Sequence, residues 1–393
     1  MLSLFFGDSR PVLAARRTTW ALGLLRRCLT SGVLTSSFLT SRVLATSVLL
    51  TGAVACGGDN GDDEPAVLAD SGSFTAVTGN TFAIPTAVAV RDNIAWVVES
   101  QFDHYAPFIP ATLPPPTPPA PFRIVGVPLP GSAETAVKSI ALPADFFPEG
   151  ITVNSSGRMY VGSVANGGIY TVNPGAEEAT EFVPPDTLAK PAVLGMAVSG
   201  DNGLLWVCNN DVAASPVVSD IVGIGAGDRQ VKATHPLLAS SVGAFCNDIV
   251  IAPNGTLWAT ESFGGRIFRI PPGELLSNTP ATAWLQATEL ASSNGPTAGE
   301  FGVNGIALVA NKLFLVNSSR GQLLSIDPTL AQPSSADLKV VLLSEAGTPG
   351  KLLVTPDGIT PVVGTNDLLV VENGFLDAGG GGKRLARISL DTL

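Results

Sequence analysis

Four residues with oxygen-bearing side chains recur at corresponding places along the sequence and could together hold a metal ion. They are Glu149, Asn247, Asn304 and Asp357, and steps of 57 and 53 residues separate the last three. Two carboxylates and two amide oxygens are hard donors of the kind that calcium prefers. No set of Cys and His residues recurs in this way, which disfavours zinc. The four residues therefore predict a site for calcium or another divalent cation.

A second interpretation of the same residues is that they only mark turns. Asn-Asp, Asn-Gly and Asp-Gly are frequent turn sequences, and three of the four residues begin such a pair. Glu149 does not fit this interpretation, because Glu is not a turn former. A buried carboxylate also needs a partner, which an apolar lining would not. We therefore favour the metal site.

The four residues lie in a longer repeat that explains how they could meet. Residues 247–270 read as three short strands separated by Asn-Gly and Gly-Gly, a strong local signal for antiparallel hairpins. Residues 149–173 and 304–327 repeat this pattern, and less regular copies bring the total to six. One position at the start of each innermost strand is occupied in turn by Thr86, Glu149, Leu194, Asn247, Asn304 and Asp357.

A repeat of three or four strands over about 40–50 residues predicts an all-β fold, a six-bladed β-propeller. The innermost strands of such a fold surround a central channel, so positions about fifty residues apart converge there. The last copy contains only three strands, and residues 67–78 form a strand pattern outside any blade. We expect this N-terminal strand to complete the last blade, because an unpaired sheet edge is a liability.

The N-terminal region has the features of an export signal. Six Arg residues precede an apolar segment at residues 43–55, and small residues lead to Cys56. We predict a cleaved signal peptide of the lipoprotein type (1–55), a polar tether (56–66) and the propeller (67–393). Lipidation of Cys56 would anchor a periplasmic or outer-membrane lipoprotein of a bacterium. In that oxidising compartment, Cys208 and Cys246 either form a disulfide or remain two buried thiols.

The net charge and the lengths of the loops indicate which kind of molecule the protein binds. The net charge is −11, and the chain from Cys56 onward carries 16 basic and 32 acidic residues. Such a surface disfavours nucleic acid, which is bound by Lys and Arg on phosphates. We expect a monomer that takes a small-molecule substrate. Three long loops could form the walls of a pocket at one end of the channel: residues 101–121 with His104, residues 209–219 and residues 373–382.

Short motifs in the inner strands resemble those of one enzyme family. PEGI (148–151), NDIVIAPNGTLWATES (247–262), VNGIALVANKLFLVNS (303–318) and PDGI (356–359) resemble the senescence marker protein, gluconolactonase and luciferin-regenerating enzyme family, which is related to diisopropylfluorophosphatase and paraoxonase. The resemblance covers residues 82–390 and implies a catalytic calcium held by Glu149, Asn247, Asn304 and Asp357. It also implies that Asp357 is the nucleophile or proton-transfer group. His104 would stand in for the paraoxonase histidine, although its surrounding sequence does not match.

Two functions follow from this resemblance and its limits. The first is an exported, calcium-dependent hydrolase of lactones, esters or phosphotriesters. The second is a non-catalytic binding or scaffold lipoprotein, since propellers serve both purposes. The column of oxygen donors favours the hydrolase. The lack of a match to the Arg and Asn that bind substrate in the gluconolactonase branch, and the long Pro-rich loop of blade 1 (101–121), favour the binding protein.

Overall fold

The computed structural model describes residues 68–79, 81–108, 117–201, 203–375 and 382–392. The predicted signal segment (1–55), Cys56 and the tether (56–66) lie outside these residues. The described helices are short 3-10 turns, and none is long and apolar enough to cross a membrane. They are η1 (Phe102–His104), η2 (Ala106–Phe108), η3 (Pro272–Glu274) and η4 (Ser335–Asp337).

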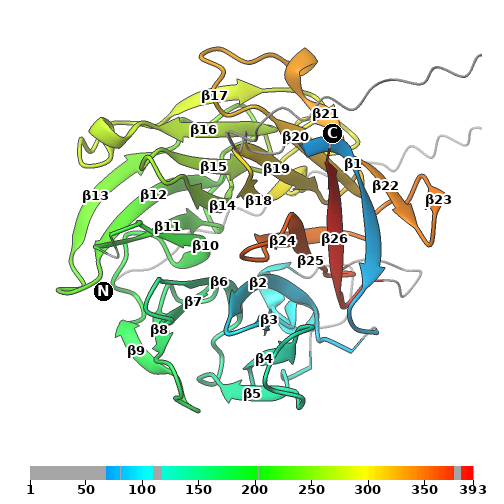
Figure 1. Cartoon of the computed structure of the whole chain (residues 1–393). Coiled ribbons are helices and arrows are strands. Elements are labelled where there is room, and N and C mark those ends of the chain that lie inside the picture. The colour runs from blue at the N-terminus through cyan, green and yellow to red at the C-terminus, as the bar shows by residue number, and fades with distance from the viewer. Residues whose placement is uncertain (1–67, 80, 109–116, 202, 376–381, 393) are drawn as a thin grey trace, which may run out of the picture. The chain divides into compact units, whose positions relative to one another are not determined.

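The strands form six sheets arranged around a centre, as predicted for a six-bladed propeller (Figure 1). Blade 1 contains β2 (Pro85–Arg91), β3 (Ile94–Glu99), β4 (Arg123–Pro128) and β5 (Lys138–Ala141). Blade 2 contains β6 (Pro148–Val153), β7 (Met159–Ser163), β8 (Ile169–Val172) and β9 (Thr180–Val183). Blade 3 contains β10 (Ala192–Val198), β11 (Leu204–Asp211), β12 (Val218–Gly225) and β13 (Val231–Pro236).

Blades 4 and 5 follow the same antiparallel order from the centre outward. Blade 4 contains β14 (Cys246–Ile251), β15 (Leu257–Glu261), β16 (Arg266–Ile270) and β17 (Thr282–Gln286). Blade 5 contains β18 (Val303–Val309), β19 (Lys312–Asn317), β20 (Gln322–Ile326) and β21 (Lys339–Val340). Each inner strand contacts the inner strands of its two neighbours, and contact between the first and last inner strands closes the ring.

The sixth blade combines strands from both ends of the described chain. Its order is β24 (Pro356–Pro361), β25 (Asp367–Glu372), β26 (Arg384–Thr392), β1 (Leu68–Ala76), β22 (Leu342–Glu345) and β23 (Thr348–Pro349). The strand β1 runs antiparallel to β26 and parallel to β22. Asp70 on β1 also accepts hydrogen bonds from Lys312 and Ser325, both at 2.6 Å, so this strand is tied to blade 5 as well.

Each inner strand has an irregular register near its start, and this irregularity carries the six column positions. In blade 2, for example, the regular pairing with β7 is interrupted between Pro148 and Ile151, and Glu149 lies inside the interruption. The same shift occurs in the other five inner strands. A bulge bends the strand and re-aims its side chains. This local irregularity turns the column residues away from the regular sheet.

The residue after the column position is glycine in four blades, where neighbouring inner strands approach closely. A Cβ on Gly150 would lie 2.2 Å from the Leu194 carbonyl oxygen of blade 3, and one on Gly195 would lie 2.4 Å from the Asn247 carbonyl oxygen. Gly305 and Gly358 meet the backbone of the next blade in the same way. These glycines therefore permit close packing between blades and do not mark turns.

Replacing Gly150 by Ala is expected to destabilise the protein by about 2–3 kcal/mol, because the new methyl group would overlap backbone atoms that cannot move without shifting blade 3. Urea unfolding of the variant measures this loss. Gly200→Ala is the matched control, because a Cβ there meets nothing within 4 Å. Equal midpoints for the two variants would contradict the close approach between blades.

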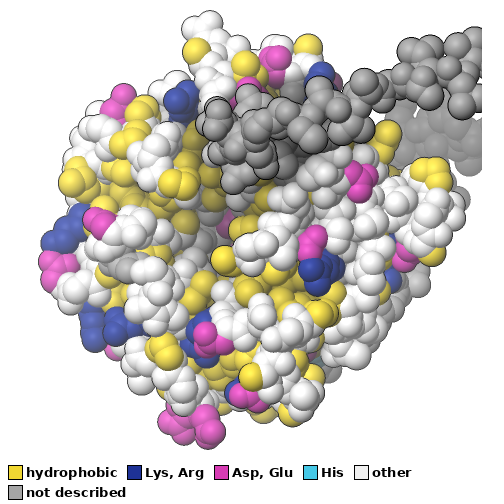
Figure 2. All heavy atoms as spheres, in the orientation of Figure 1, with side chains coloured by type: hydrophobic (Ala, Val, Ile, Leu, Met, Phe, Trp, Pro, Cys, Tyr) yellow, Lys and Arg dark blue, Asp and Glu magenta, His cyan; other side chains and the backbone are white. Residues whose placement is uncertain are grey.

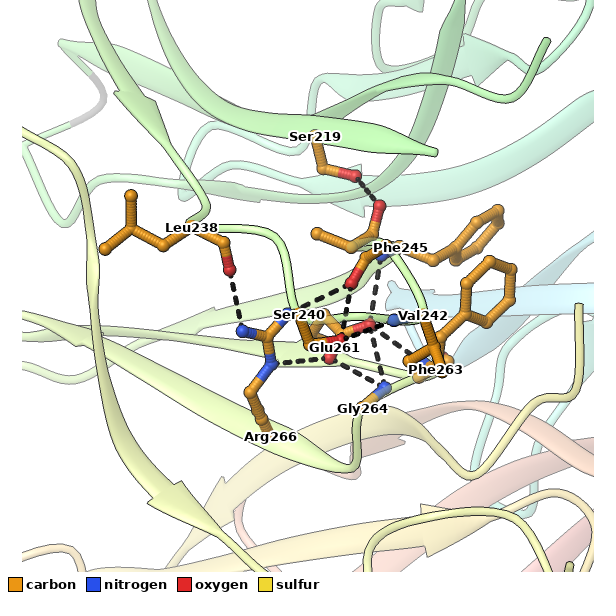
Figure 3. A network of polar contacts seen from close by, with 12 residues as sticks. Ser219, Leu238, Ser240, Val242, Phe245, Glu261, Phe263, Gly264 and Arg266 are labelled. Carbon is orange, nitrogen blue, oxygen red and sulfur yellow. Dashed lines mark hydrogen bonds and ion pairs between the residues drawn. The ribbon is translucent and has the colours of Figure 1, made fainter. Parts of the chain in front are cut away.

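A buried ion pair holds the segment that leads into the inner strand of blade 4 (Figure 3). The Glu261 carboxylate accepts the N–H of Phe245 at 3.1 Å and the Nε–H of Arg266 at 2.8 Å. Arg266 in turn donates to the carbonyl oxygen of Leu238 at 2.7 Å. Blades 1 and 6 contain an equivalent ion pair. Glu99 pairs with Arg123 in blade 1, and Glu372 pairs with Arg384 in blade 6. The repeated pair fixes the residues that precede three of the inner strands.

Candidate functional site

The column residues meet in one cavity of about 360 Å³. Its wall includes Glu149, Asn247, Asn304 and Asp357, the four predicted metal ligands, together with Leu194. All five lie at the beginning of inner strands, and all are buried. Thr86 is not part of this wall. Its hydroxyl donates to the carbonyl oxygen of Glu149 at 2.8 Å, so it fixes the strand that carries Glu149.

The two asparagines are oriented by serines that follow the second strands of their blades. Asn247 Nδ2 donates to Ser262 Oγ, and Asn304 Nδ2 donates to Ser318 Oγ, each at 3.0 Å. These two hydroxyls donate onward to main-chain carbonyl oxygens of the next blade. The amide nitrogens are therefore committed to the protein, which leaves the amide oxygens as ligands. Asn304 Oδ1 is buried and has no hydrogen-bond partner among the described residues.

The two carboxyl groups of the set are held in an environment that disfavours their charge. Burial, followed by the proximity of Asp357 and Asp248, raises the pKa of Glu149 well above its usual value. Burial also raises the pKa of Asp357 to about 7, although hydrogen bonds from Asn373 and Asn304 oppose the rise. No Lys, Arg or His of the described chain lines the cavity. A bound cation would supply the charge that these carboxylates lack.

Asp248 occupies the position that is glycine in four other blades. Burial raises the pKa of its carboxyl group to about 7, and hydrogen bonds from the N–H groups of Ile306 and Ile249 oppose this rise. The bond from Ile306, at 3.1 Å, links blade 4 to the inner strand of blade 5. Asp248 does not line the cavity that holds the four predicted ligands. It therefore serves the contact between blades.

Besides Leu194, five phenylalanines form the apolar part of the cavity wall, and none of the five belongs to the column. Phe102, Phe108 and Phe375 come from the long loops of blades 1 and 6, whereas Phe245 and Phe301 flank blade 4. The rings of Phe102 and Phe108 have centroids 4.9 Å apart, and those of Phe245 and Phe301 lie 5.1 Å apart. The predicted loops of blades 1 and 6 thus do contribute walls.

One sequence-based expectation about the walls differs from the structure, and one part of the wall was not expected at all. The blade 3 loop (209–219) does not line the cavity. Its ends are instead used within the fold, where Asn210 and Ser219 bind the main chain of Cys246 and Ala244. The connection between blades 4 and 5 takes its place and contributes a set that the sequence did not indicate: Ser293, Asn294, Gly299, Glu300 and Phe301.

Neither histidine reaches the cavity. His104 was predicted to act in catalysis, but it is absent from the cavity wall, and its Nδ1 lies 2.8 Å from the carbonyl oxygen of Thr117 within its own loop. His235 is buried on β13, where its ring nitrogens lie 2.8 Å from the carbonyl oxygens of Leu275 and Thr279. Asp357 is therefore the predicted catalytic residue that the structure brings to the site.

The two cysteines of the propeller are joined in a disulfide. Cys208 lies within β11 and Cys246 begins β14, with their Cα atoms 5.3 Å apart. The bridge links blade 3 to blade 4 directly beside Asn247. It thereby adds a covalent constraint to the segment that carries one predicted ligand.

Comparison with known proteins supports the architecture. The N-terminal model of the strictosidine synthase-like family matches residues 135–172, a span that includes β6 and Glu149. No curated protein matches the sequence. Among solved structures, a luciferin-regenerating enzyme has a TM-score of 0.55 and 12% identity, with 82% of this chain and 98% of that chain covered.

Two further solved structures have a similar fold. A calcium-binding protein, regucalcin, from Agrobacterium tumefaciens has a TM-score of 0.52 and 12% identity, with 83% of this chain and 97% of that chain covered. An auxiliary nutrient binding protein from Bacteroides thetaiotaomicron has a TM-score of 0.52 and 12% identity, with 82% and 76% covered. At such identities the likeness concerns the fold alone. The chain is thus a six-bladed propeller similar to luciferin-regenerating enzyme and regucalcin, as its inner-strand motifs indicated.

Proposed function

We propose that this protein is a calcium-dependent hydrolase of lactones, esters or phosphotriesters, with the metal in the central channel. The observation that carries the proposal is the convergence of Glu149, Asn247, Asn304 and Asp357 on one cavity. The donor set fits calcium, because two carboxylates and two amide oxygens leave room for water or substrate in a six- to eight-coordinate site. The unpartnered oxygen of Asn304 supports the same assignment.

In this proposal, each residue of the site has a distinct role. Glu149, Asn247, Asn304 and Asp357 would hold the cation, whose contribution when bound is to polarise a carbonyl or phosphoryl oxygen. Asp357 would also act on the substrate, either as the nucleophile or by accepting the proton of an attacking water. Asn373 donates to Asp357 Oδ2 at 2.6 Å and so fixes the orientation of this carboxylate.

A substrate panel tests this proposal most directly. Lactones, carboxylic esters and phosphotriesters would be assayed with the full protein in calcium, and again after treatment with a chelator. We expect at least one class to be hydrolysed in calcium, with the activity lost on chelation and restored by added calcium. No turnover of any class would refute the hydrolase, and turnover that survives complete removal of metal would refute its dependence on calcium.

Calcium binding should weaken as the pH falls. The pKa of Asp357 is raised to about 7, so below that pH a proton occupies the carboxylate and must leave before calcium binds. Affinity is expected to drop by about tenfold per pH unit for each proton displaced. Calorimetric titration with calcium at pH 8, 7 and 6 measures this slope. An affinity that does not change over this range would contradict a site built on these carboxylates.

A non-catalytic binding protein is the second candidate, and one observation favours it. No Lys, Arg or His of the described chain lines the cavity, so carboxylates are the only acid–base groups there. A binding propeller would still bind calcium but would hydrolyse no member of the panel. The panel and the calcium titration together separate the two candidates.

We also propose that the protein is exported and held at a bacterial membrane by a lipid on Cys56. The Cys208–Cys246 disulfide supports this, because such bonds persist mainly in oxidising compartments. The mass of the intact protein from the membrane fraction provides the test. We expect a chain that begins at Cys56 with added lipid mass; an unlipidated chain that retains residues before Cys56 would refute the anchor.

A further inference from the structure

The cavity surrounds its polar floor with phenyl rings, and these rings form two separate walls. Phe102, Phe108 and Phe375 make one wall; the Phe102 and Phe375 rings have centroids 6.1 Å apart. Phe245 and Phe301 make the other, and their ring centroids lie 5.1 Å apart. Phe108, Phe301 and Phe375 are only half-buried, so apolar surface remains accessible inside the cavity. An apolar ligand group would cover this surface.

The polar side chains around the cavity are largely committed to the protein. Ser318 donates to the carbonyl oxygen of Pro356, and Ser319 donates to Asn317 Oδ1. Asn373 uses its Nδ2 on Asp357, and Asn294 uses its Nδ2 on Glu300. A ligand rich in hydroxyl groups would find few free partners here. Burying hydroxyl groups without partners is costly, so the cavity discriminates against such ligands.

The charge of the cavity also disfavours anionic ligands. Glu300 lies at the wall, and hydrogen bonds from Ser292 and Asn294 lower the pKa of its carboxyl group. It therefore stays negative near neutral pH, while Glu149 and Asp357 would be compensated by the cation. With no cationic side chain in the described wall, an anionic ligand would be repelled. On the face that Figure 2 shows, Lys and Arg lie in a few small groups among Asp and Glu and form no large basic patch.

We infer that the substrate is an uncharged ester or lactone that carries an aromatic group, bound between the two phenylalanine walls with its carbonyl oxygen toward the cation that Asn304 and Asp357 would hold. This rests on the proposed hydrolase function and specifies its substrate class. A cavity of about 360 Å³ suits a compound of one or two rings. Sugar lactones and anionic esters are excluded as good substrates.

A binding experiment without turnover tests the aromatic walls. N-phenyl-1-naphthylamine, an uncharged dye that fluoresces in apolar surroundings, would be titrated into the full protein and into variants of Phe301 and Phe375. Phe301→Ser and Phe375→Ser are expected to weaken binding by about tenfold each, because each removes one apolar contact surface. Phe301→Leu and Phe375→Leu keep an apolar side chain and should lose less than about threefold.

Both positions are half-buried, so the substitutions should leave the fold intact, and thermal melting of each variant checks this. Dye affinity that stays within about twofold of the parent in both folded Ser variants would overturn the inference. If a Ser variant fails to fold, its Leu counterpart decides. A Leu variant that binds the dye tenfold more weakly than the parent would contradict an apolar role for that wall.

Kinetics separate this inference from the function on which it rests. Phenyl acetate is expected to show a kcat/KM at least about a hundredfold above that of a polyhydroxylated sugar lactone, and the Ser variants should raise its KM. If the sugar lactone is preferred, the aromatic inference fails while the hydrolase stands. If no ester is hydrolysed but the dye results hold, the hydrolase fails and the aromatic ligand class is retained.

Discussion

Replacing Asp357 by Asn is expected to reduce the hydrolysis by about a thousandfold or more, because the amide can neither attack nor accept a proton. The change also removes one of the two charges that hold the cation, while the shape of the side chain is kept. Glu149→Gln removes the other charge and should likewise weaken calcium binding. A metal that binds only the folded protein raises its melting temperature, so both variants should show a smaller calcium-induced shift.

Two measurements on the same samples check this result: kcat/KM for the best substrate, and melting temperature with calcium or with chelator. Asp201→Asn is the control, since Asp201 lies in an exposed turn of blade 3 away from the cavity. It should behave as the parent does in both assays. A calcium-induced shift of full size in both Asp357→Asn and Glu149→Gln would place the calcium elsewhere in the molecule.

Replacing Phe74 by Ala is expected to destabilise the protein by about 3–5 kcal/mol, the usual cost of emptying a buried phenylalanine position. Phe74 lies on β1, is 2% exposed, and packs with Leu343, Ile388 and Leu390 of the sixth blade. Its ring also lies 4.4 Å from the Lys351 ammonium group. This one side chain therefore joins the N-terminal strand to the core of the last blade.

Chemical unfolding in urea measures the loss, and Thr75→Ala provides a matched change on the same strand. Thr75 is exposed and should cost less than about 0.5 kcal/mol. Deletion of residues 57–78 should have a larger effect than Phe74→Ala. It should abolish cooperative unfolding in urea, because β26 would lose its neighbour β1. A protein that melts normally without this segment would show that the ring closes without β1.

The blades could be predicted from the sequence because their first three strands are local hairpins. The alternation of polar and apolar residues and the turn sequences of each blade lie within about 25 consecutive residues. The repeat can therefore be recognised without knowing any long-range contact. The outer strands carry less signal: β21 contains only Lys339 and Val340. The addition of β22 and β23 to the last blade could not be predicted, because β22 pairs with β1 from the other end of the described chain.

The polar half of the cavity could be predicted and the apolar half could not. Glu149 and Asp357 occupy equivalent repeat positions, so the symmetry of the fold brings them together. Phe301 and Glu300 lie in an irregular connection with no repeat, so their position depends on how that loop packs. His104 shows the same limit. Its loop was placed at the correct end of the channel, but the turn of η1 directs its ring toward Thr117.

The seam between β1 and β26 also sets an order for the assembly of the ring. Thr78 accepts a hydrogen bond from the N–H of Leu385, a residue 307 positions later in the chain. Closing a flexible loop of this length costs about 5 kcal/mol beyond a constant, whereas the hairpins of the other blades close over a few residues. We therefore expect β1 to remain without a partner until the five complete blades have formed and drawn the two ends together. During that interval its unpaired backbone groups are exposed to other chains, so the period before the ring closes is when this protein is most prone to aggregate.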